Sequence, residues 1–269
     1  MVTFLFWNIN GKPLLDSIEA IAQEESVDVL ILAECRIEAR DLLQVLNRKR
    51  PEFHLARGIS SQLVIYTRFP REFMAPAFDG NRVSIRRLRL PARLDVLLVA
   101  VHFPSKLRWS DESQMLECTQ LSHIITAEEM RVGHRRTIVV GDLNMNPFEK
   151  GMVGAAGLHA VPTRNVAERG GRVVQGRTYP FFYNPMWGHF GDRSERPPGS
   201  YYYERAEQVS YFWHTFDQVL IRPQLMDRLR ADQVRILDKA GDSPLATEDG
   251  HPDVKNLSDH FPLLFRLDL

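Results

Sequence analysis

The stretch that decides the fold is Thr137-Ile138-Val139-Val140-Gly141-Asp142-Leu143-Asn144, in which an apolar run ends in a glycine and an Asp-x-Asn pair. A short, continuous apolar run of this kind is typical of a strand that is buried on both faces. In open α/β sheets, ligands bind beyond the carboxyl ends of such strands. We therefore expect Asp142 and Asn144 to lie at a functional site.

Four other segments place polar side chains beside apolar runs in the same way. Strand-like runs end in Asn8, in Glu34 and in His102, and the sequence Ser258-Asp259-His260 stands near the carboxyl terminus. Carboxylate and amide oxygens are ligands for hard cations such as Mg²⁺, whereas imidazole provides acid–base chemistry near neutral pH. These residue types together predict a hard-metal site with histidine partners.

Composition indicates an ordinary globular protein. The chain has 269 residues, of which 25% are charged and 44% hydrophobic, so it can bury a sizeable core. Lys plus Arg equals Asp plus Glu at 34 each, which excludes a whole-molecule basic field for nucleic acid. The two cysteines do not make a disulfide framework. Since neither a secretory signal pattern nor a membrane-length apolar stretch is visible, we expect a cytoplasmic protein without a membrane partner.

Strand-like and helix-like runs alternate along the chain. Helices are expected around residues 14–22, 42–46 and 112–130, and strands around 27–33, 62–67, 83–90, 94–101, 137–140, 216–221 and 261–267. The order is strand, helix, strand, helix, then a meander, and then the same again. This order predicts two similar halves whose sheets pack face to face with helices outside.

Residues 163–211 differ from the rest because they are rich in glycine, proline, arginine and aromatic residues. We expect a long aromatic-rich insertion on a single domain that spans residues 1–269. Within it, residues 191–200 have the composition of a mobile loop.

Six segments, in this order, resemble the endonuclease/exonuclease/phosphatase superfamily, which includes pancreatic deoxyribonuclease and the AP endonucleases. They are Trp7-Asn8-Ile9-Asn10-Gly11, Leu32-Ala33-Glu34, Val101-His102-Phe103-Pro104-Ser105, Gly141-Asp142-Leu143-Asn144, Thr215-Phe216-Asp217-Gln218-Val219-Leu220 and Ser258-Asp259-His260. The resemblance implies a four-layer α/β sandwich, in which two packed mixed β-sheets are flanked by helices. It also implies one active site at the mouth between the sheets and metal-dependent cleavage of a phosphate ester.

The resemblance also suggests metal ligands. Glu34 and Asp259 would hold Mg²⁺ or Mn²⁺, and Asn8 would support them through a metal-bound water or by bonding Glu34. Such sparse ligation suits Mg²⁺, which is usually bound by one or two carboxylates together with waters and substrate phosphate oxygens. The open positions let the cation polarise the phosphate and neutralise the leaving oxygen.

Acid–base and positioning roles follow in the same way. Asp142 and Asn144 would position the attacking water and the phosphate. His260 would lie beside the scissile phosphate with Asp217 bonded to its other ring nitrogen, which fixes the tautomer and raises the imidazole pKa. His102 would work opposite His260, as in the deoxyribonuclease and phosphodiesterase branches.

Two questions about this site stay open at the level of sequence. The segment Asn8-Ile9-Asn10-Gly11 resembles the AP endonucleases instead, although His102 carries more weight because it touches the chemistry. The carboxylate partner of His102 is not identifiable, with Glu72 and Asp79 as candidates.

Basic and aromatic residues favour a nucleic acid substrate. Arg87 and Arg89 share a parity with Arg93 and could line one strand face toward phosphates. Ser105 and Lys106 follow His102, with Arg108 just beyond, where a backbone phosphate would approach. The aromatic residues of 163–211 offer surfaces for base stacking.

The sequence therefore predicts a monomeric, Mg²⁺- or Mn²⁺-dependent phosphodiesterase that hydrolyses nucleic acid by in-line attack of water. One alternative is a phosphatase or phosphodiesterase that acts on small-molecule or lipid-headgroup phosphoesters. Another is a catalytically silent binding protein, whose expected mark would be a lost metal or histidine position, and no such position is lost. The choices between DNA and RNA, single and double strand, and endonuclease and exonuclease stay open.

Overall fold

The computed structural model describes residues 1–56, 58–106, 109–191, 197–206 and 208–269. Two mixed sheets form its centre. The first has the strand order β16 (Arg235–Ile236), β19 (Leu263–Leu267), β1 (Val2–Asn8), β2 (Val29–Ala33), β4 (Leu63–Thr67) and β3 (His54–Ala56). The second has the order β5 (Met74–Asp79), β6 (Val83–Leu88), β7 (Val96–His102), β8 (Thr137–Asp142), β15 (Asp217–Ile221), β12 (Phe182–Tyr183) and β9 (Ala160–Val161).

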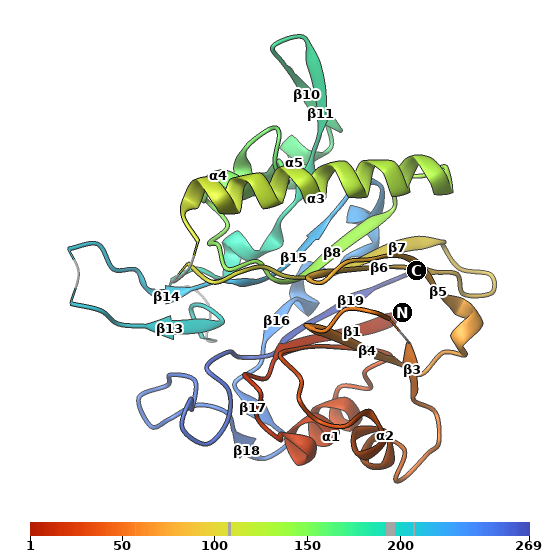
Figure 1. Cartoon of the computed structure of the whole chain (residues 1–269), viewed down its shortest axis with the longest axis vertical. Helices are drawn as coiled ribbons and strands as arrows, with labels where there is room; N and C mark the ends of the chain where they lie inside the picture. Colours follow the sequence, from red (N-terminus) through yellow and green to blue (C-terminus); the bar gives the residue numbers. More distant parts are fainter. Residues whose placement is uncertain (57, 107–108, 192–196, 207) are drawn as a thin grey trace.

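The two sheets face each other, and helices cover their outer faces (Figure 1). Helices α1 (Leu15–Glu24) and α2 (Ala39–Leu46) lie against the first sheet. Helices α3 (Asp111–Val132), α4 (Lys150–Val153) and α5 (Arg164–Ala167) lie on the side of the second sheet. One apolar cluster joins buried side chains of both sheets, such as Phe4 and Val140. This arrangement confirms the predicted four-layer α/β sandwich.

Helix α3 shows how the sequence produces one of these layers. Cys118, Leu121 and Ile125 recur at helical spacing and are fully buried against the second sheet. The hydroxyl of Ser110 accepts a hydrogen bond from the backbone N–H of Ser113 and caps the amino end. Gly133 ends the helix in the left-handed region, with φ of 78°. The apolar stripe and the two end signals therefore define this helix locally.

The two halves repeat one topology, and the repeat creates the site. Strands β1 and β2 are parallel, as are β7 and β8, and each pair is joined through a helix. Asn8 at the end of β1 pairs with Ala33, the residue before Glu34. His102 at the end of β7 pairs with Asp142 at the end of β8. Because parallel strands end at a common edge, four polar side chains gather there.

Gly141 is required at this edge by the close approach of β7. A Cβ added at Gly141 would lie 1.9 Å from the carbonyl oxygen of Val101. No side chain fits in that space, so only glycine lets β8 lie beside β7 directly before Asp142. The glycine of the opening motif is therefore a packing requirement of the strand pair.

Residues 163–211 contain several short strands and helices, and one of these strands belongs to the second sheet. Strand β12 pairs with β15 and with β9. A hairpin of β10 (Gly171–Val174) and β11 (Arg177–Pro180) projects from the body (Figure 1). A second hairpin joins β13 (Tyr201–Tyr203) to β14 (Phe212–His214). Part of the expected mobile loop, residues 192–196, lies outside the described residues.

Short elements complete the described chain. They are the strands β17 (Lys239–Ala240) and β18 (Ser243–Pro244) and the 3₁₀ helices η1 (Arg71–Phe73), η2 (Pro185–His189), η3 (Pro223–Arg228) and η4 (Ala231–Gln233). Within the described ranges, none of the helices combines the length and the apolar character that crossing a membrane requires.

Candidate active site

A cleft of about 830 Å³ opens at the edge where the parallel strands end. Most of the predicted site residues line it: Asn8, Glu34, His102, Ser105, Lys106, Asp142, Asn144, Asp259 and His260. Asp217 is buried behind His260. Arg87 and Arg89 are not among the lining residues. Tertiary structure thus joins residues from both sheets into one site.

Asp142 lies at the centre of the polar side chains. Its Oδ1 accepts a hydrogen bond from the backbone N–H of Asn144 at 2.9 Å, and its Oδ2 accepts one from Nδ2 of Asn8 at 3.0 Å. The Nε2 atoms of His102 and His260 each lie 3.8 Å from Oδ2 of Asp142. The buried carboxylate therefore faces two imidazoles and is oriented by two amides.

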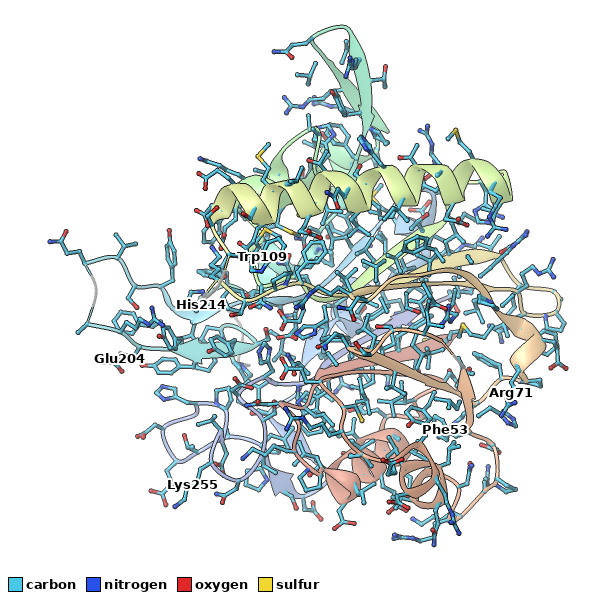
Figure 2. All side chains as sticks on the ribbon, in the orientation of Figure 1. Phe53, Arg71, Trp109, Glu204, His214 and Lys255 are labelled. Carbon is cyan, nitrogen blue, oxygen red and sulfur yellow. The ribbon has the colours of Figure 1, made fainter. Side chains whose placement is uncertain are left out.

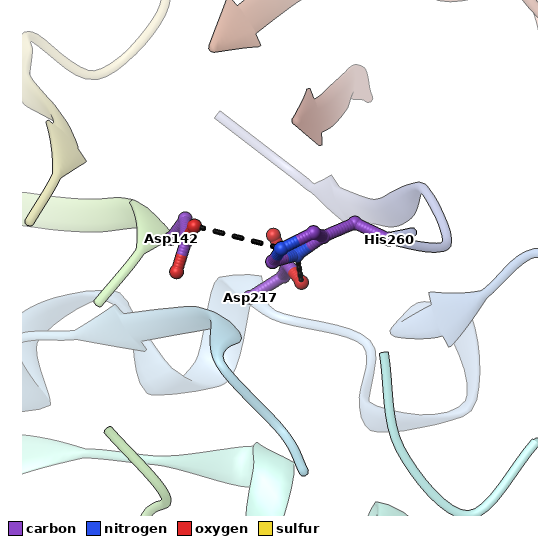
Figure 3. Close-up of side chains that lie close together, drawn as sticks. All are labelled: Asp142, Asp217 and His260. Atoms are coloured by element: carbon purple, nitrogen blue, oxygen red, sulfur yellow. Dashed lines mark hydrogen bonds and ion pairs between the residues drawn. The ribbon is translucent and has the colours of Figure 1, made fainter. Parts of the chain in front are cut away.

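His260 and Asp217 form a buried pair, seen beside Asp142 in Figure 3. Nδ1 of His260 lies 2.7 Å from Oδ2 of Asp217. Burial by itself lowers the pKa of His260, but the carboxylates of Asp217 and Asp142 outweigh it and raise that pKa to about 10. His260 is therefore an imidazolium at neutral pH, with Nε2 directed toward Asp142.

The loop that carries His260 is tied to the first sheet. The indole N–H of Trp7 donates to the carbonyl oxygen of His260 at 2.8 Å. The hydroxyl of Ser258 donates to the carbonyl oxygen of Asn8 at 2.6 Å and accepts from the backbone N–H of His260. Trp7 and Ser258 stood inside the quoted motifs but had no assigned role, because their function depends on contacts across about 250 residues of chain.

Glu34 is held by Asn8 and His102. Nε2 of His102 lies 3.3 Å from Oε1 of Glu34, and Nδ2 of Asn8 donates to the same oxygen at 3.4 Å. The hydrogen bond with His102 is the largest influence on Glu34 and lowers its pKa, so the group is a carboxylate at neutral pH. Glu34 has a φ of 50°, a left-handed conformation that is uncommon for residues other than glycine.

The open question about His102 has a structural answer. Its neighbouring carboxylates are Glu34 and Asp142, so neither suggested residue is its partner. Asp79 instead pairs with Nη2 of Arg86 at 2.8 Å and accepts from the Ser84 hydroxyl. Both partners lie on the adjacent strand β6, which holds the Asp79 carboxylate away from His102.

Two different sets of residues could hold a metal ion. Asp142, Asp217 and His260 offer ligand atoms within 4.8 Å of one another. However, Asp217 and His260 are already hydrogen-bonded to each other, and Mg²⁺ and Mn²⁺ prefer oxygen ligands. The oxygens of Glu34, Asn8 and Asp259 also line the cleft, and the Glu34 side chain is 40% exposed. The second set fits a hard cation better because its donor atoms are all oxygens and its Glu34 carboxylate is accessible.

Asn144 lines the cleft and is held by the segment that follows β7. Its Nδ2 donates to the carbonyl oxygen of Phe103 at 2.8 Å. An amide nitrogen carries two hydrogens, so the second can be donated to a phosphate oxygen. Asn144 has a φ of 49°, which places another left-handed residue at the cleft.

Asn146 and His214 also line the cleft and were not predicted from the sequence; His214 is labelled in Figure 2. Nδ2 of Asn146 lies 3.0 Å from Nδ1 of His214, and Oδ1 of Asn146 accepts from the backbone N–H of Thr215. Burial, with a smaller effect of Lys106, lowers the pKa of His214 to about 4, so His214 is neutral at neutral pH. The signals in the sequence were Asn146, two residues after Asn144, and His214, directly before Thr215-Phe216-Asp217.

The predicted phosphate-binding residues have different locations. Ser105 and Lys106 line the cleft, and Lys106 forms ion pairs with Glu149 and with Asp111. Arg87 pairs with Asp95 at 2.5 Å and lies at the end of β6 that is remote from His102, and Arg89 follows it. Arg108 lies outside the described residues.

Among the described residues, the arginines that line the cleft are Arg36, Arg82 and Arg205. Nη1 of Arg82 donates to the carbonyl oxygen of His102, because the start of β6 lies beside the end of β7. Arg82, directly before β6, therefore reaches the site at the strand end opposite to Arg87.

The comparisons agree with this fold. The sequence profile of the Endonuclease/Exonuclease/phosphatase family matches residues 5–260, and the chain belongs to this family. The chain is thus a phosphoric ester hydrolase of a metal-dependent family. No curated protein sequence matches the chain at a significant level.

Several solved structures share the fold. The 3′ phosphatase NExo from Neisseria, bound to a product DNA hairpin, has 13% identity and a TM-score of 0.58, with all of both chains covered. Truncated TDP2 from Caenorhabditis elegans has 16% identity and a TM-score of 0.56, with 99% of this chain and 97% of that chain covered. An AP endonuclease from Archaeoglobus fulgidus has 14% identity and a TM-score of 0.53, with both chains fully covered.

Proposed function

We propose that the protein is a Mg²⁺- or Mn²⁺-dependent phosphodiesterase that hydrolyses nucleic acid by in-line attack of water. The observation that carries this proposal is the position of Asp142, whose Oδ2 faces Nε2 of both His102 and His260 at 3.8 Å. In this position the Asp142 carboxylate can accept a proton from the attacking water, while the two imidazoles lie beside it as cationic or hydrogen-bonding groups.

Each residue then has a defined task. Asp142 orients the attacking water and accepts its proton, while Asn144 donates to a phosphate oxygen. The imidazolium of His260 stabilises negative charge on the phosphate, and Asp217 holds that ring in the required tautomer. A cation bound by Glu34, Asp259 and Asn8 would polarise the phosphate and neutralise the leaving oxygen.

The lining of the cleft supports a nucleic acid substrate. Its basic side chains are Arg36, Arg82, Lys106 and Arg205, and its acidic side chains are Glu34, Asp142, Glu149 and Asp259. The positive charge of His260 is compensated by Asp217 behind it, so the charges of the described residues balance. A bound divalent cation then makes the cleft net positive, which favours a phosphate backbone. The NExo structure contains a DNA hairpin, and this chain shares its fold.

Cleavage of a substrate panel tests the proposal. The panel contains a single-stranded oligonucleotide, a duplex, a structured RNA and bis(p-nitrophenyl) phosphate, each with Mg²⁺, with Mn²⁺ and with a chelator. The variant is Asp142→Asn, and Asp41→Asn on the exposed side of α2 is the matched control. We expect metal-dependent nucleic acid cleavage that Asp142→Asn abolishes and Asp41→Asn retains.

Two results would redirect the proposal. Hydrolysis of the small ester alone would favour the alternative of small-molecule or lipid-headgroup phosphoesters. Nucleic acid cleavage that survives Asp142→Asn in the folded protein would overturn the assigned site. The monomeric state and the cytoplasmic location stay predictions, testable by light scattering and by cell fractionation.

A further inference from the structure

The β13–β14 hairpin carries aromatic side chains on both of its faces. Its register pairs Tyr201 with His214, Tyr202 with Trp213 and Tyr203 with Phe212. Because side chains alternate along a strand, Tyr201, Tyr203 and His214 share one face, and Tyr202 and Trp213 share the other. The first three line the cleft, whereas Tyr202 and Trp213 do not.

The face away from the cleft anchors the hairpin. The ring of Tyr202 stacks on His251 with centroids 3.6 Å apart and an interplanar angle of 10°. Trp213 stacks on Phe261 with centroids 6.3 Å apart and an angle of 19°. Phe261 directly follows His260, so these contacts couple the hairpin to the catalytic loop. Tyr202 and Trp213 therefore contribute to packing the hairpin onto the body of the protein.

The aromatic rings on the face toward the cleft form a row that runs from the interior of the protein toward solvent. Phe216 is buried and stacks on Tyr201 at 5.3 Å with an angle of 28°. Tyr201 stacks on Tyr203 at 6.2 Å with an angle of 24°. Cζ of Arg205 lies 4.8 Å from the ring centroid of Tyr203. Residues 201, 203 and 205 are spaced by two, so the row follows one side of the chain from the interior toward solvent.

This row begins at the proposed reaction centre. The ring of Tyr201 lies 4.8 Å from that of His260, and the two residues form an isolated β-bridge. Tyr201 and Tyr203 are only partly buried, so part of each ring is open to the cleft. A pair of accessible, nearly parallel rings beside a phosphate-cleaving centre is suited to flat apolar groups.

We propose that Tyr201 and Tyr203 form a stacking subsite for nucleobases of an unpaired strand, next to the phosphate that is cleaved. The inference rests on the proposed function and adds the strand type to it. A base in a duplex is stacked on its neighbours and paired, so it must leave the helix before it can stack on Tyr203. The substrate class is therefore single-stranded nucleic acid, or a frayed or unpaired end.

The test uses Tyr203 because its side chain is the outer ring of the row. Tyr203→Ala removes the ring, Tyr203→Phe keeps it, and Tyr179→Ala on strand β11 is a control outside the cleft lining. The substrates are a single-stranded oligonucleotide of the sugar type that the wild type cleaves, the same strand with one abasic nucleotide at each position flanking the cleaved bond, its duplex, and bis(p-nitrophenyl) phosphate.

We expect Tyr203→Ala to raise KM for the single strand by roughly 5- to 150-fold, the range for loss of one base–aromatic stack. Tyr203→Phe and Tyr179→Ala should keep the wild-type KM. For one of the abasic strands, the wild type and Tyr203→Ala should have the same KM, because the base that would stack on Tyr203 is already missing. Hydrolysis of the small ester should be the same in the wild type and in Tyr179→Ala.

The outcomes separate this inference from the proposed function. If the wild type cleaves nucleic acid but Tyr203→Ala changes KM for the intact and the abasic strands by the same factor, the stacking subsite is refuted. The proposed function is not affected by that result. A wild type that cleaves duplex more efficiently than single strand would also refute it. If the wild type cleaves only the small ester, the proposed function fails and the subsite fails with it.

Discussion

Nδ1 of His260 lies 2.7 Å from Oδ2 of Asp217, and both side chains are buried at the back of the cleft. Asp217 is contributed by β15 of the second sheet, and His260 by the loop that leads into β19 of the first. The pair therefore forms only when the two sheets are packed together. It links the stability of the sandwich to the charge state of the active site.

Asp217→Asn should lower kcat by roughly 100-fold or more, within the range for loss of acid–base assistance by a positioned histidine. The amide keeps the shape of the carboxylate but removes the charge that holds His260 as an imidazolium. Steady-state rates on the cleaved substrate measure the effect, and circular dichroism verifies the fold. Exposed Asp227→Asn is the matched control. A kcat near that of the wild type would contradict the role given to the pair.

The same pair should make the stability of the metal-free protein depend on pH. The pKa of His260 is about 10 in the folded protein and 6.5 ordinarily, so the folded state retains a proton that the unfolded chain releases between these values. The stabilisation is complete below pH 6.5 and is lost as the pH rises toward 10. Urea denaturation should show a loss of at least about 1 kcal/mol across this window.

The control for this pH dependence is Asp217→Asn, which removes the largest charge that raises the His260 pKa. Its free energy of unfolding should vary less over the same pH window. An equal slope in wild type and variant would show that other groups cause the dependence.

Glu34→Gln should weaken metal binding by more than about tenfold, because even residues that merely orient ligands cost 10- to 100-fold in affinity. The amide keeps a carbonyl oxygen but lacks the negative charge that a divalent cation needs. Mn²⁺ binding, followed by electron paramagnetic resonance, reads affinity independently of activity. Glu38→Gln, four residues along the chain and exposed, should bind Mn²⁺ like the wild type. Unchanged Mn²⁺ affinity in Glu34→Gln would exclude Glu34 as a ligand.

Glu129→Ala should destabilise the protein by about 3–5 kcal/mol, since it leaves Arg222 as an unpaired buried charge. Nε of Arg222 donates to Glu129 at 2.8 Å, and both side chains are buried between α3 and β15. Urea denaturation measures the loss. Glu128→Ala breaks a pair with Arg131, whose side chain is 55% exposed, and should cost less than about 1 kcal/mol. Similar losses of unfolding free energy in the two variants would show that the buried Glu129–Arg222 pair stabilises the protein no more than the other pair does.

Much of the fold could be predicted because its signals are local. The apolar run 137–140, the helical stripe of Cys118, Leu121 and Ile125, and the Gly133 stop each act within a few residues. The same holds for the strand ends that carry Asn8 and Asp142. Topology then brings strand ends of equal direction to one edge, so a list of strand-end polar residues already approximates the site.

Other features depended on partners that are distant in sequence. Arginines 82 and 87 lie on or beside one strand and look equivalent in the sequence, yet one reaches the cleft and the other pairs with Asp95. Lys106 pairs with Glu149, 43 residues further along the chain. Which end of a strand faces the cleft, and which charges are neutralised, follows from strand order and register.

The sequence by itself determined which residues lie at strand ends, because hydrophobic periodicity and strand-end chemistry are properties of short segments. Only the tertiary structure decided that His102 faces Glu34 and that Tyr203 faces the cleft while Tyr202 packs away from it. Those relationships require two sheets in contact and a hairpin docked on a distant loop. Burial and pairing across long stretches of chain, unlike periodicity, exist only once the chain has folded.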